Sequence, residues 1–464
     1  MVFQNNVLSG AGGSGTTVYA IDQSIRFNDD DNAYLSRTLS TASDGGKTYT
    51  WSWWQKLGSK YGANVQYIIH TDLSGGNFAD YFYFYNDNFQ YWSQPTGLYL
   101  RTDREFRDPS AWYHFVFVRD TTQAVSSERL RLYVNGIRET SFSTESYPAL
   151  NSSGYFNTNT AHYIGGANTL SNRLDAYMAE IHFLDGYAYD PSFFGEFNSS
   201  GIWIPKKYTG SYGTNGFKID GRDSSDLGDD ESGNGNDFTT SGLGAHDQVL
   251  DSPTNNFAVL NPISSSGLAS GELTGGNLEM RNIDYIDATV PFPTSGKWYY
   301  ELCVVSKTQG NWNYGNHYFR DIVDGFPDSN FTDYITTNFY HGSNFYSSSN
   351  WTDGDFWTNS NNPSAGDIYG FAWDSDTKKI WLAKNNTYFG SGNPAGNSGT
   401  PLGSGGTAGV EYVVTLYSTL SQVMTLNFGQ DDTFNNAKTS GSAGAADGNG
   451  NGKFYYAPPT GFLA

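Results

Sequence analysis

Acidic side chains are the first residues to test for chemistry, because hydrolysis of a glycosidic bond needs two carboxyl groups held about 5–9.5 Å apart. A β-strand presents two residues on one face when an even number of positions separates them. Glu180 is the best placed acidic residue within an apolar run, and Asp185 follows it at an odd spacing. This spacing predicts carboxylates on opposite faces of a strand. No catalytic residue is assigned, Glu180 is expected to cap or pair at a sheet edge, and the protein is predicted not to be an enzyme.

The histidines provide no hydrolytic motif. None of the seven lies in a His-x-Glu-x-x-His or Gly-x-Ser-x-Gly context, which argues against metal-dependent hydrolysis and against a serine triad. His114 and His182 fall within strand-like patterns. Both are therefore predicted to pack or to form hydrogen bonds rather than to act as bases.

Oxygen-rich turns leave Ca²⁺ as the one cofactor that the sequence keeps open. The run from Asp447 to Gly452 matches the first half of a calcium-binding loop, but position twelve of that loop is Pro458 instead of a bidentate glutamate. The EF-hand interpretation fails there, and solvated acidic turns are the commoner outcome of such runs. The candidate cation ligands are Asp447, Asn449, Asn451, Asp229 and Asp230.

Aromatic residues in predicted loops of the C-terminal half give the strongest indication of binding. Sugar rings present C–H faces that stack on aromatic planes, and their hydroxyl groups need amide and carboxylate partners. The candidate ligand-binding residues, which are interleaved with Asn, Ser and Asp, are Trp312, Tyr314, His317, Tyr340, His341, Trp351 and Trp357. Two other interpretations stay open: these rings fill a core, or they anchor a protein interface.

A second aromatic run lies nearer the N-terminus. Tyr81, Tyr83 and Tyr85 alternate with Phe82 and Phe84. This pattern is interpreted first as a strand packed on both faces, and only second as a binding site.

Composition limits the classes of partner. The chain has 464 residues, with 47 Asp and Glu against 26 Lys and Arg, so its net charge of −21 argues against nucleic acid and anionic membrane surfaces. A single cysteine, Cys303, excludes an intramolecular disulfide framework. No membrane-spanning apolar run and no recognisable Sec signal are found, so membrane insertion is not expected.

Short apolar or alternating runs bounded by turn residues recur along the chain, which predicts an all-β protein. The clearest hairpin joins the run from Leu130 to Val134 to Asn135 and Gly136, a pair typical of a type I′ turn. Phe115 and Phe117 alternate with further apolar residues, so their strand is expected inside a sandwich. The predicted fold is two antiparallel β-sandwich (jelly-roll-type) domains joined by an irregular connector.

Glycine-rich and polar stretches set the predicted boundaries. Residues 1–20 are predicted to be a flexible N-terminal tether arm, and residues 201–250 a connector rich in Gly, Ser and Asp. The two sandwiches are then residues 21–200 and 251–464. No repeat of fixed period is visible, which disfavours a propeller or a β-helix.

The first block resembles the laminin-G-like, concanavalin-like jelly roll. The matching pieces run from Tyr49 to Trp54, Trp112 to Val116, Leu132 to Gly136, Ile164 to Gly166 and Ala176 to Gly186. The second block resembles a SPRY domain, a β-sandwich that binds through loops at one end. Its matching pieces run from Ser295 to Glu301, Tyr369 to Asp374, Lys379 to Asn386 and Leu426 to Gln430.

Nearly the whole chain resembles virion proteins of tailed bacteriophages, marine ones in particular. The pieces that carry this resemblance run from Ala20 to Asn28, Tyr34 to Thr38, Trp203 to Gly213 and Gly452 to Gly461. The resemblance implies a structural component on the virion surface, made in the host cytoplasm and released by lysis.

The implied function is that of a fibre, decoration or tail-associated adhesin that binds host-surface polysaccharide. The implied partners also include other virion proteins, held through the N-terminal arm, and a homo-oligomer is expected by analogy with fibre proteins. Two alternatives remain: a purely structural virion component that makes protein contacts, and a glycan depolymerase.

Overall fold

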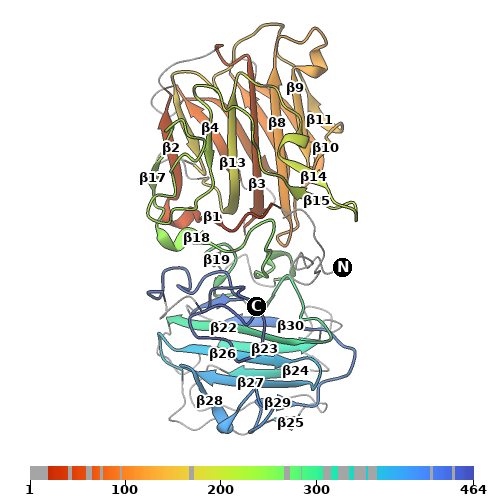
Figure 1. The fold of residues 1–464 in the computed structure, drawn as a ribbon, viewed down its shortest axis with the longest axis vertical. Coiled ribbons are helices and arrows are strands. Elements are labelled where there is room, and N and C mark those ends of the chain that lie inside the picture. The colour runs from red at the N-terminus through yellow and green to blue at the C-terminus, as the bar shows by residue number, and fades with distance from the viewer. Residues whose placement is uncertain are drawn as a thin grey trace. The chain divides into compact units, whose positions relative to one another are not determined.

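The computed structural model describes residues 19–39, 44–58, 65–73, 77–94, 97–166, 172–265, 272–283, 285–306, 315–321, 334–338, 352–353, 363–418, 422–440 and 445–464. These residues form antiparallel β-strands and short 3-10 helices, which confirms the predicted fold class (Figure 1). The chain divides into two compact units between Asn256 and Phe257. Within the described part, no helix has the length and apolarity needed to span a membrane.

The first unit is built from two antiparallel sheets, here called sheet A and sheet B. Sheet A has the order β10 (Ile137–Arg138), β9 (Leu130–Val134), β8 (Trp112–Asp120), β3 (Thr48–Leu57), β13 (Ala176–Asp185), β1 (Ser24–Phe27) and β18 (Gln248–Val249), and β16 (Phe217–Ile219) also pairs with β13. Strands β13, β3 and β8 are seen side by side in Figure 1.

Sheet B has the order β11 (Phe142–Glu145), β7 (Gly97–Glu105), β6 (Asn88–Ser93), β5 (Phe78–Tyr85), β4 (Gln66–Asp72), β12 (Ala161–Ile164), β2 (Tyr34–Thr38) and β17 (Thr239–Ser241). A separate hairpin pairs β14 (Gly195–Phe197) with β15 (Trp203–Pro205). The 3-10 helices of this unit are η2 (Asp29–Asp31), η3 (Ser126–Glu128), η4 (Pro191–Phe193) and η5 (Ala245–Asp247).

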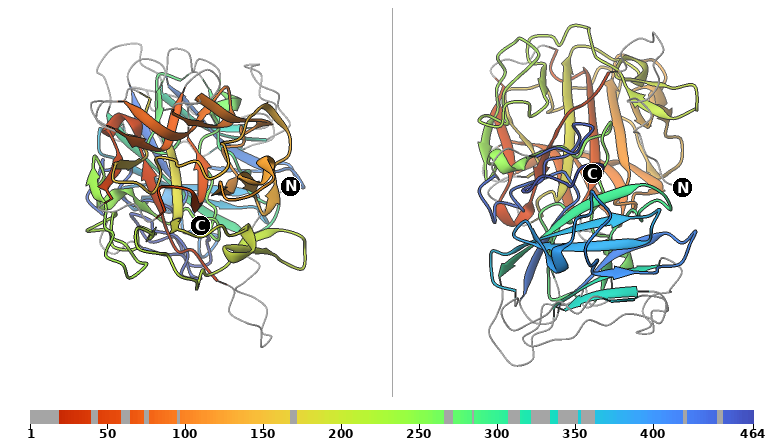
Figure 2. Two further views of the ribbon diagram at one scale, coloured as in Figure 1. Left: turned by 90° about the horizontal axis from the view of Figure 1, so that it is seen from above. Right: turned by 60° about the horizontal axis from the view of Figure 1, so that its bottom comes forward.

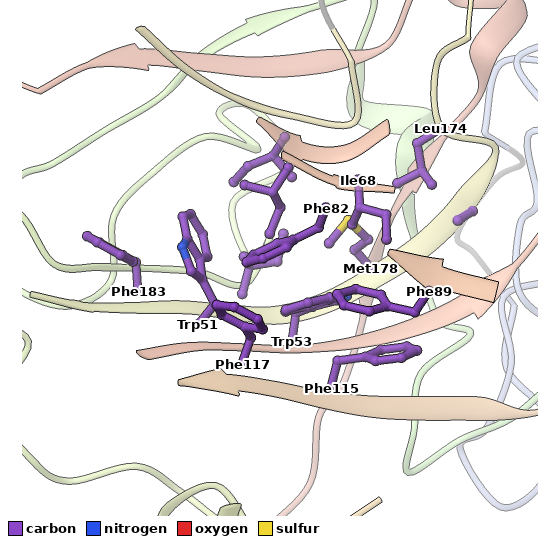
Figure 3. Close-up of a cluster of buried hydrophobic side chains, with 14 of the residues drawn as sticks. Trp51, Trp53, Ile68, Phe82, Phe89, Phe115, Phe117, Leu174, Met178 and Phe183 are labelled. Carbon is purple, nitrogen blue, oxygen red and sulfur yellow. The ribbon is translucent and has the colours of Figure 1, made fainter. Parts of the chain in front are cut away.

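Aromatic rings from both sheets fill the core of the first unit (Figure 3). Trp53 of sheet A stacks on Phe82 of sheet B with ring centroids 5.7 Å apart, and on Phe115 of its own sheet at 5.3 Å. These side chains are fully buried. Burial of each such ring stabilises the fold by about 1.5–3 kcal/mol, so this cluster is a major source of stability.

The opposite face of sheet A is also covered. Val116 and Val118 of β8 pack there in a second cluster with Phe194 and Tyr208, whereas Phe115 and Phe117 face the main core. The prediction that this strand lies inside a sandwich is confirmed. The chain that follows β13 thus closes the outer face of sheet A.

The predicted hairpin after Val134 is also confirmed. Asn135 and Gly136 have φ angles of 49° and 78°, as a type I′ turn requires, and Val134 pairs with Ile137. Trp203 packs over this turn, because a Cβ atom on Gly136 would lie 2.4 Å from its ring.

Residues 201–250, predicted to be a connector, supply strands to both sheets of the first unit. Strand β16 pairs with β13 and β18 pairs with β1 in sheet A, while β17 pairs with β2 in sheet B. The first unit therefore extends to Asn256 instead of ending at residue 200. Most of the predicted arm, residues 1–18, lies outside the described residues.

The second unit also contains two antiparallel sheets. The larger, sheet C, has the order β19 (Glu272–Thr274), β20 (Glu279–Arg281), β31 (Val423–Asn427), β22 (Lys297–Ser306), β26 (Ile368–Asp374), β27 (Lys379–Lys384), β29 (Gly403–Ser404) and β25 (Thr352–Asp353), and β28 (Thr387–Tyr388) also pairs with β27. The right view of Figure 2 shows its teal to blue strands side by side.

The smaller sheet D has the order β21 (Ile286–Asp287), β30 (Tyr412–Ser418), β23 (Gly315–Asp321) and β24 (Tyr334–Asn338). The 3-10 helices are η6 (Pro262–Ser264) and η8 (Phe389–Ser391). The four sequence pieces that resemble a SPRY domain correspond to β22, β26, β27 and β31, which are adjacent in sheet C.

A buried carboxyl group holds the segment of residues 445–464 against sheet C. Glu301 of β22 accepts hydrogen bonds from the backbone N–H groups of Tyr455 and Tyr456, at 2.9 and 2.8 Å, and from the side chains of Tyr299 and Asn427, at 3.2 and 3.3 Å. Burial raises the pKa of Glu301 to about 7, although these four donors favour the ionised form. The carboxyl therefore titrates near neutral pH.

This titration predicts a pH-dependent stability. Because the folded-state pKa of Glu301 lies above its ordinary value, its contribution to the free energy of unfolding falls as pH rises from about 5 to about 8, by about 3 kcal/mol at most. The side chain of the variant Glu301→Gln cannot ionise, so the free energy of unfolding of this variant should not show the decrease due to Glu301. It should differ from the wild-type value at low pH only by a constant amount, which reflects one missing hydrogen-bond acceptor. Urea unfolding measures the free energy of unfolding of both proteins at the two pH values. A difference between wild type and variant that is the same at both pH values would contradict the prediction.

Candidate functional site

The aromatic residues predicted to bind a ligand fall mostly outside the described residues. This holds for Trp312, Tyr314, Tyr340, His341, Trp351 and Trp357. The backbone of His317 lies in β23, paired with Thr337 and Leu416, and its side chain is outside the described part. Their role in binding stays a prediction.

The predicted cation ligands at residues 447–451 form a hydrogen-bonded turn. The carboxylate of Asp447 accepts from the backbone N–H groups of Asn449 and Asn451, at 2.8 and 2.9 Å, and from that of Ala464 at 3.0 Å. Both carboxylate oxygens thus stabilise local backbone.

Asp230 has a similar role. It accepts hydrogen bonds from the backbone of Lys218, Ser232 and Asn236, at 2.8 to 2.9 Å. Burial, followed by the charges of neighbouring aspartates, raises the pKa of Asp229. Among the residues described, no group of three or more His, Cys, Asp or Glu side chains could hold a metal ion. Calcium binding stays a prediction.

Glu180 lies inside sheet A and not at its edge, which corrects the expectation from the sequence. It occupies a β-bulge with φ +45°, where the partner of β13 changes from β1 to β16. Its carboxylate is 2.6 Å from Nζ of Lys218 and 3.4 Å from Nε2 of His182, and it accepts a hydrogen bond from the hydroxyl of Tyr19. The expectation that Glu180 is paired is confirmed.

This environment does not suit a general acid. Burial alone would raise the pKa of Glu180, but the hydrogen bond and charge of His182, together with the ammonium of Lys218, lower it to about 2. A second carboxylate, Asp220, lies 3.1 Å from the same ammonium. A glycosidase needs one carboxyl protonated at working pH, whereas Lys218 stabilises the ionised form of Glu180.

Ser52 and His114 form a buried pair in which the histidine cannot act as a general base for the serine hydroxyl. The indole N–H of Trp203 donates to Nδ1 of His114 at 3.0 Å. Burial and the charge of His182 lower the pKa of His114 to about 3, so the ring is neutral and carries its proton on Nε2. That proton is donated to Oγ of Ser52 at 2.9 Å, so His114 cannot accept the hydroxyl proton of Ser52.

The outer face of sheet B carries a set of aromatic side chains, here called the aromatic shelf. In β5, Phe82 and Phe84 enter the core, and Tyr81 and Tyr83 are left half-buried on the other face. Neighbouring strands contribute rings to the same face. The shelf consists of Tyr34, Tyr67, His70, Phe78, Tyr81, Tyr83, Trp92 and Tyr163, all half-buried except His70, which is fully buried.

Four of these side chains form a row across the strands. Tyr163 of β12 pairs in register with His70 of β4, His70 pairs with Tyr81 of β5, and Tyr81 pairs with Trp92 of β6. The ring of Tyr163 stacks on His70 with centroids 4.8 Å apart, and Tyr81 stacks on Trp92 at 4.9 Å. Contacts between neighbouring rings restrict their rotamers, so the shelf is largely preorganised.

His70 differs from the other buried histidines. The ring of Phe78 contacts that of His70 edge-on with centroids 5.0 Å apart, in addition to the stacking contact with Tyr163. Neither Nδ1 nor Nε2 has a hydrogen-bond partner among the described residues. Burial, with a smaller effect of His162, lowers the pKa of His70 to about 3, so the imidazole is neutral. Leaving such a group unpaired costs about 1–3 kcal/mol.

Four tyrosines of the shelf, Tyr67, Tyr81, Tyr83 and Tyr163, keep their hydroxyl protons. Burial raises the pKa of Tyr83 to about 12 and also raises that of Tyr81, of Tyr67 and of Tyr163. The hydroxyl of Tyr83 donates to Oε1 of Gln90 at 2.7 Å. The shelf therefore presents apolar ring edges together with neutral groups that can donate and accept hydrogen bonds.

The alternating run of β5 is interpreted from the sequence first as a strand packed on both faces and only second as a binding site, and its role in binding stays a prediction. Tyr81, Tyr83 and Tyr85 are half-buried, so β5 is packed on only one of its two faces by the core. The alternation of Tyr and Phe in the sequence correctly predicted a strand whose successive side chains face opposite sides of the sheet. It could not show that β4, β6 and β12 add rings in register, because each supplies only one or two of them.

Comparisons with known proteins place the first unit among lectin-like folds. Residues 28–188 match the family model described as the concanavalin A-like lectin/glucanases superfamily. This range includes every strand that carries the row. Comparison with curated proteins found no match.

Several solved structures resemble parts of the chain at low identity. A SAP-like pentraxin from Limulus polyphemus is 16% identical, with a TM-score of 0.28, over 37% of this chain and 80% of the pentraxin. The SPRY domain of human HERC1 is 16% identical, with a TM-score of 0.28, over 36% of this chain and 96% of that domain. Domain 4 of the arabinanase AbnA from Geobacillus stearothermophilus, in complex with arabinotriose, is 18% identical, with a TM-score of 0.24, over 33% of this chain and 66% of that domain.

Two of the buried histidines, His70 and His114, allow a matched stability test. Replacing His70 by Phe removes unpaired nitrogens and keeps the ring stacking, so His70→Phe should leave the free energy of unfolding unchanged or raise it by about 1 kcal/mol. Replacing His114 by Phe leaves Ser52 and Trp203 without a partner, so His114→Phe should lower it by about 1–3 kcal/mol. Denaturant titration compares them, and an equal loss in both variants would show that His70 has hydrogen bonds it is inferred to lack.

Proposed function

We propose that this protein binds glycans without cleaving them, and that the aromatic shelf of sheet B is the binding surface. The observation that carries the proposal is the row Tyr163, His70, Tyr81 and Trp92. These residues lie in register across four strands of sheet B, on the face opposite the core. Tyr163, Tyr81 and Trp92 are half-buried, so part of each ring remains accessible beside the polar groups of the shelf, as in surfaces that bind ligands.

The chemistry of the shelf suits a sugar. Ring edges and faces contact the C–H groups of a pyranose, and neutral phenol hydroxyls exchange hydrogen bonds with its hydroxyl groups. The family model matched by residues 28–188 names lectins and glucanases in its description, and both classes act on carbohydrates, which supports a sugar as the ligand. Because Glu180 is held ionised and His114 cannot act as a base for Ser52, these two sites favour binding over hydrolysis.

The resemblance of the sequence to phage virion proteins supports a proposal for where the protein acts. We propose a surface component of a phage particle, a fibre, decoration or tail-associated adhesin, anchored by residues 1–20 to other virion proteins or to sister copies. In this proposal the ligand is host-surface polysaccharide. Deleting residues 1–20 should then abolish incorporation into particles, and incorporation of the shortened protein would refute the tether.

A purely structural role is the second candidate. Tyr and Trp side chains also anchor protein interfaces, so the same shelf could hold a neighbouring virion protein. Purified protein that decorates particles lacking it, yet binds neither host cells nor any glycan, would favour this role. Release of reducing ends from host polysaccharide would instead favour a depolymerase.

The binding test uses variants of the row. Tyr81→Ala and Trp92→Ala each remove a stacked ring, so each should weaken polysaccharide binding about tenfold. Phe193→Ala is the matched control, since Phe193 is 41% exposed and stacks on Tyr189 in the segment that covers sheet A. Affinity electrophoresis in host polysaccharide measures the change. No retardation of the wild-type protein, or equal loss in the control, would overturn the proposal.

A further inference from the structure

The direction and length of the row limit the size of the ligand. Strands lie about 4.8 Å apart, so the three gaps between β12 and β6 give a row of about 14 Å. A single sugar ring covers about as much surface as one aromatic ring. A ligand that contacts the whole row must therefore contain several linked units and must lie across the strands.

The charges around the row limit the chemistry of the ligand. Among the described side chains that face outward on β4, β5, β6 and β12, the one charged group is the carboxylate of Asp72. The nearest guanidinium in register, Arg101 of β7, donates from Nε and Nη2 to Oδ1 of Asn88. The four strands of the row contribute no cationic side chain among the described residues. The charge of Arg101 does reach Tyr83, but the net charge of −21 on the chain repels an anionic sugar at long range.

The unpaired imidazole supplies the polar contact. A neutral histidine carries one N–H donor and one acceptor nitrogen, and a sugar hydroxyl can serve either. His70 occupies the centre of the row, and Phe78 covers it edge-on at 5.0 Å. Direct contact of a hydroxyl group with the fully buried His70 therefore requires the half-buried ring of Phe78 to rotate away when the ligand binds.

From these three observations we propose that the shelf takes a segment of an uncharged polysaccharide several units long, laid across the strands, with one hydroxyl hydrogen-bonded to His70. This inference rests on the proposed function and goes beyond it, because it names the charge, length and orientation of the ligand and the residue that selects for a hydroxyl.

Calorimetric titration with two series of oligosaccharides tests the ligand class. One series contains neutral homo-oligosaccharides from monosaccharide to hexasaccharide, and the other contains uronic acid oligomers of the same lengths. We expect affinity for the neutral series to rise with length and then level off, and to exceed affinity for the uronic acids about tenfold or more at equal length. Equal affinity for a monosaccharide and a hexasaccharide, or tighter binding of the uronic acids, would overturn the inference while leaving glycan binding intact.

His70→Phe tests the hydroxyl contact separately. We expect an affinity for the neutral hexasaccharide about tenfold lower, without loss of stability, because the ring stack remains and the hydrogen-bonding nitrogens are gone. Phe193→Ala should bind as the wild type does. Unchanged affinity in His70→Phe would refute the role of His70, whereas a wild-type protein that binds no member of either series would refute the proposed function itself.

Discussion

The alternation of side chains along sheet B is the constraint on which the first unit depends. Phe82 and Phe84 must enter the core to pack against Trp53 and Phe115, and this commits Tyr81 and Tyr83 to the opposite face. A slip of one residue would exchange the two sets, at the cost of several buried rings. The core therefore fixes the shelf, and each ring of the row is positioned by the burial of its neighbours in sequence.

Local patterns predicted local structure well. The Asn135-Gly136 turn and the strand of Phe115 and Phe117 followed from residue type and spacing alone, and so did the all-β class. The row was beyond such reasoning, because Tyr163 and His70 become neighbours only when distant segments pair. The bulge at Glu180 was also beyond such reasoning, because it forms where the partner of β13 changes from β1 to β16. The loop aromatics from Trp312 to Trp357 lie mostly outside the described residues and remain a separate prediction.

The buried polar groups of the protein fall into two kinds. Glu180, His114 and Glu301 each have hydrogen bonds or an ion pair that account for their burial, and such groups stabilise one arrangement of the chain. His70 has no such compensation among the described residues. An apolar ring at this position would avoid that cost, and the proposed binding surface gives the imidazole a hydrogen-bond partner.

The strands contributed by residues 217–249 have a consequence for how this unit can be moved between proteins. A fragment cut at residue 200 would lose β16, β17 and β18, and β1 and β2 would become open sheet edges prone to pairing with other chains. The stretch recognised as lectin-like is thus shorter than the module that can be transplanted. Recombination, whether natural or in the laboratory, has to cut after Asn256 to transfer an intact sandwich.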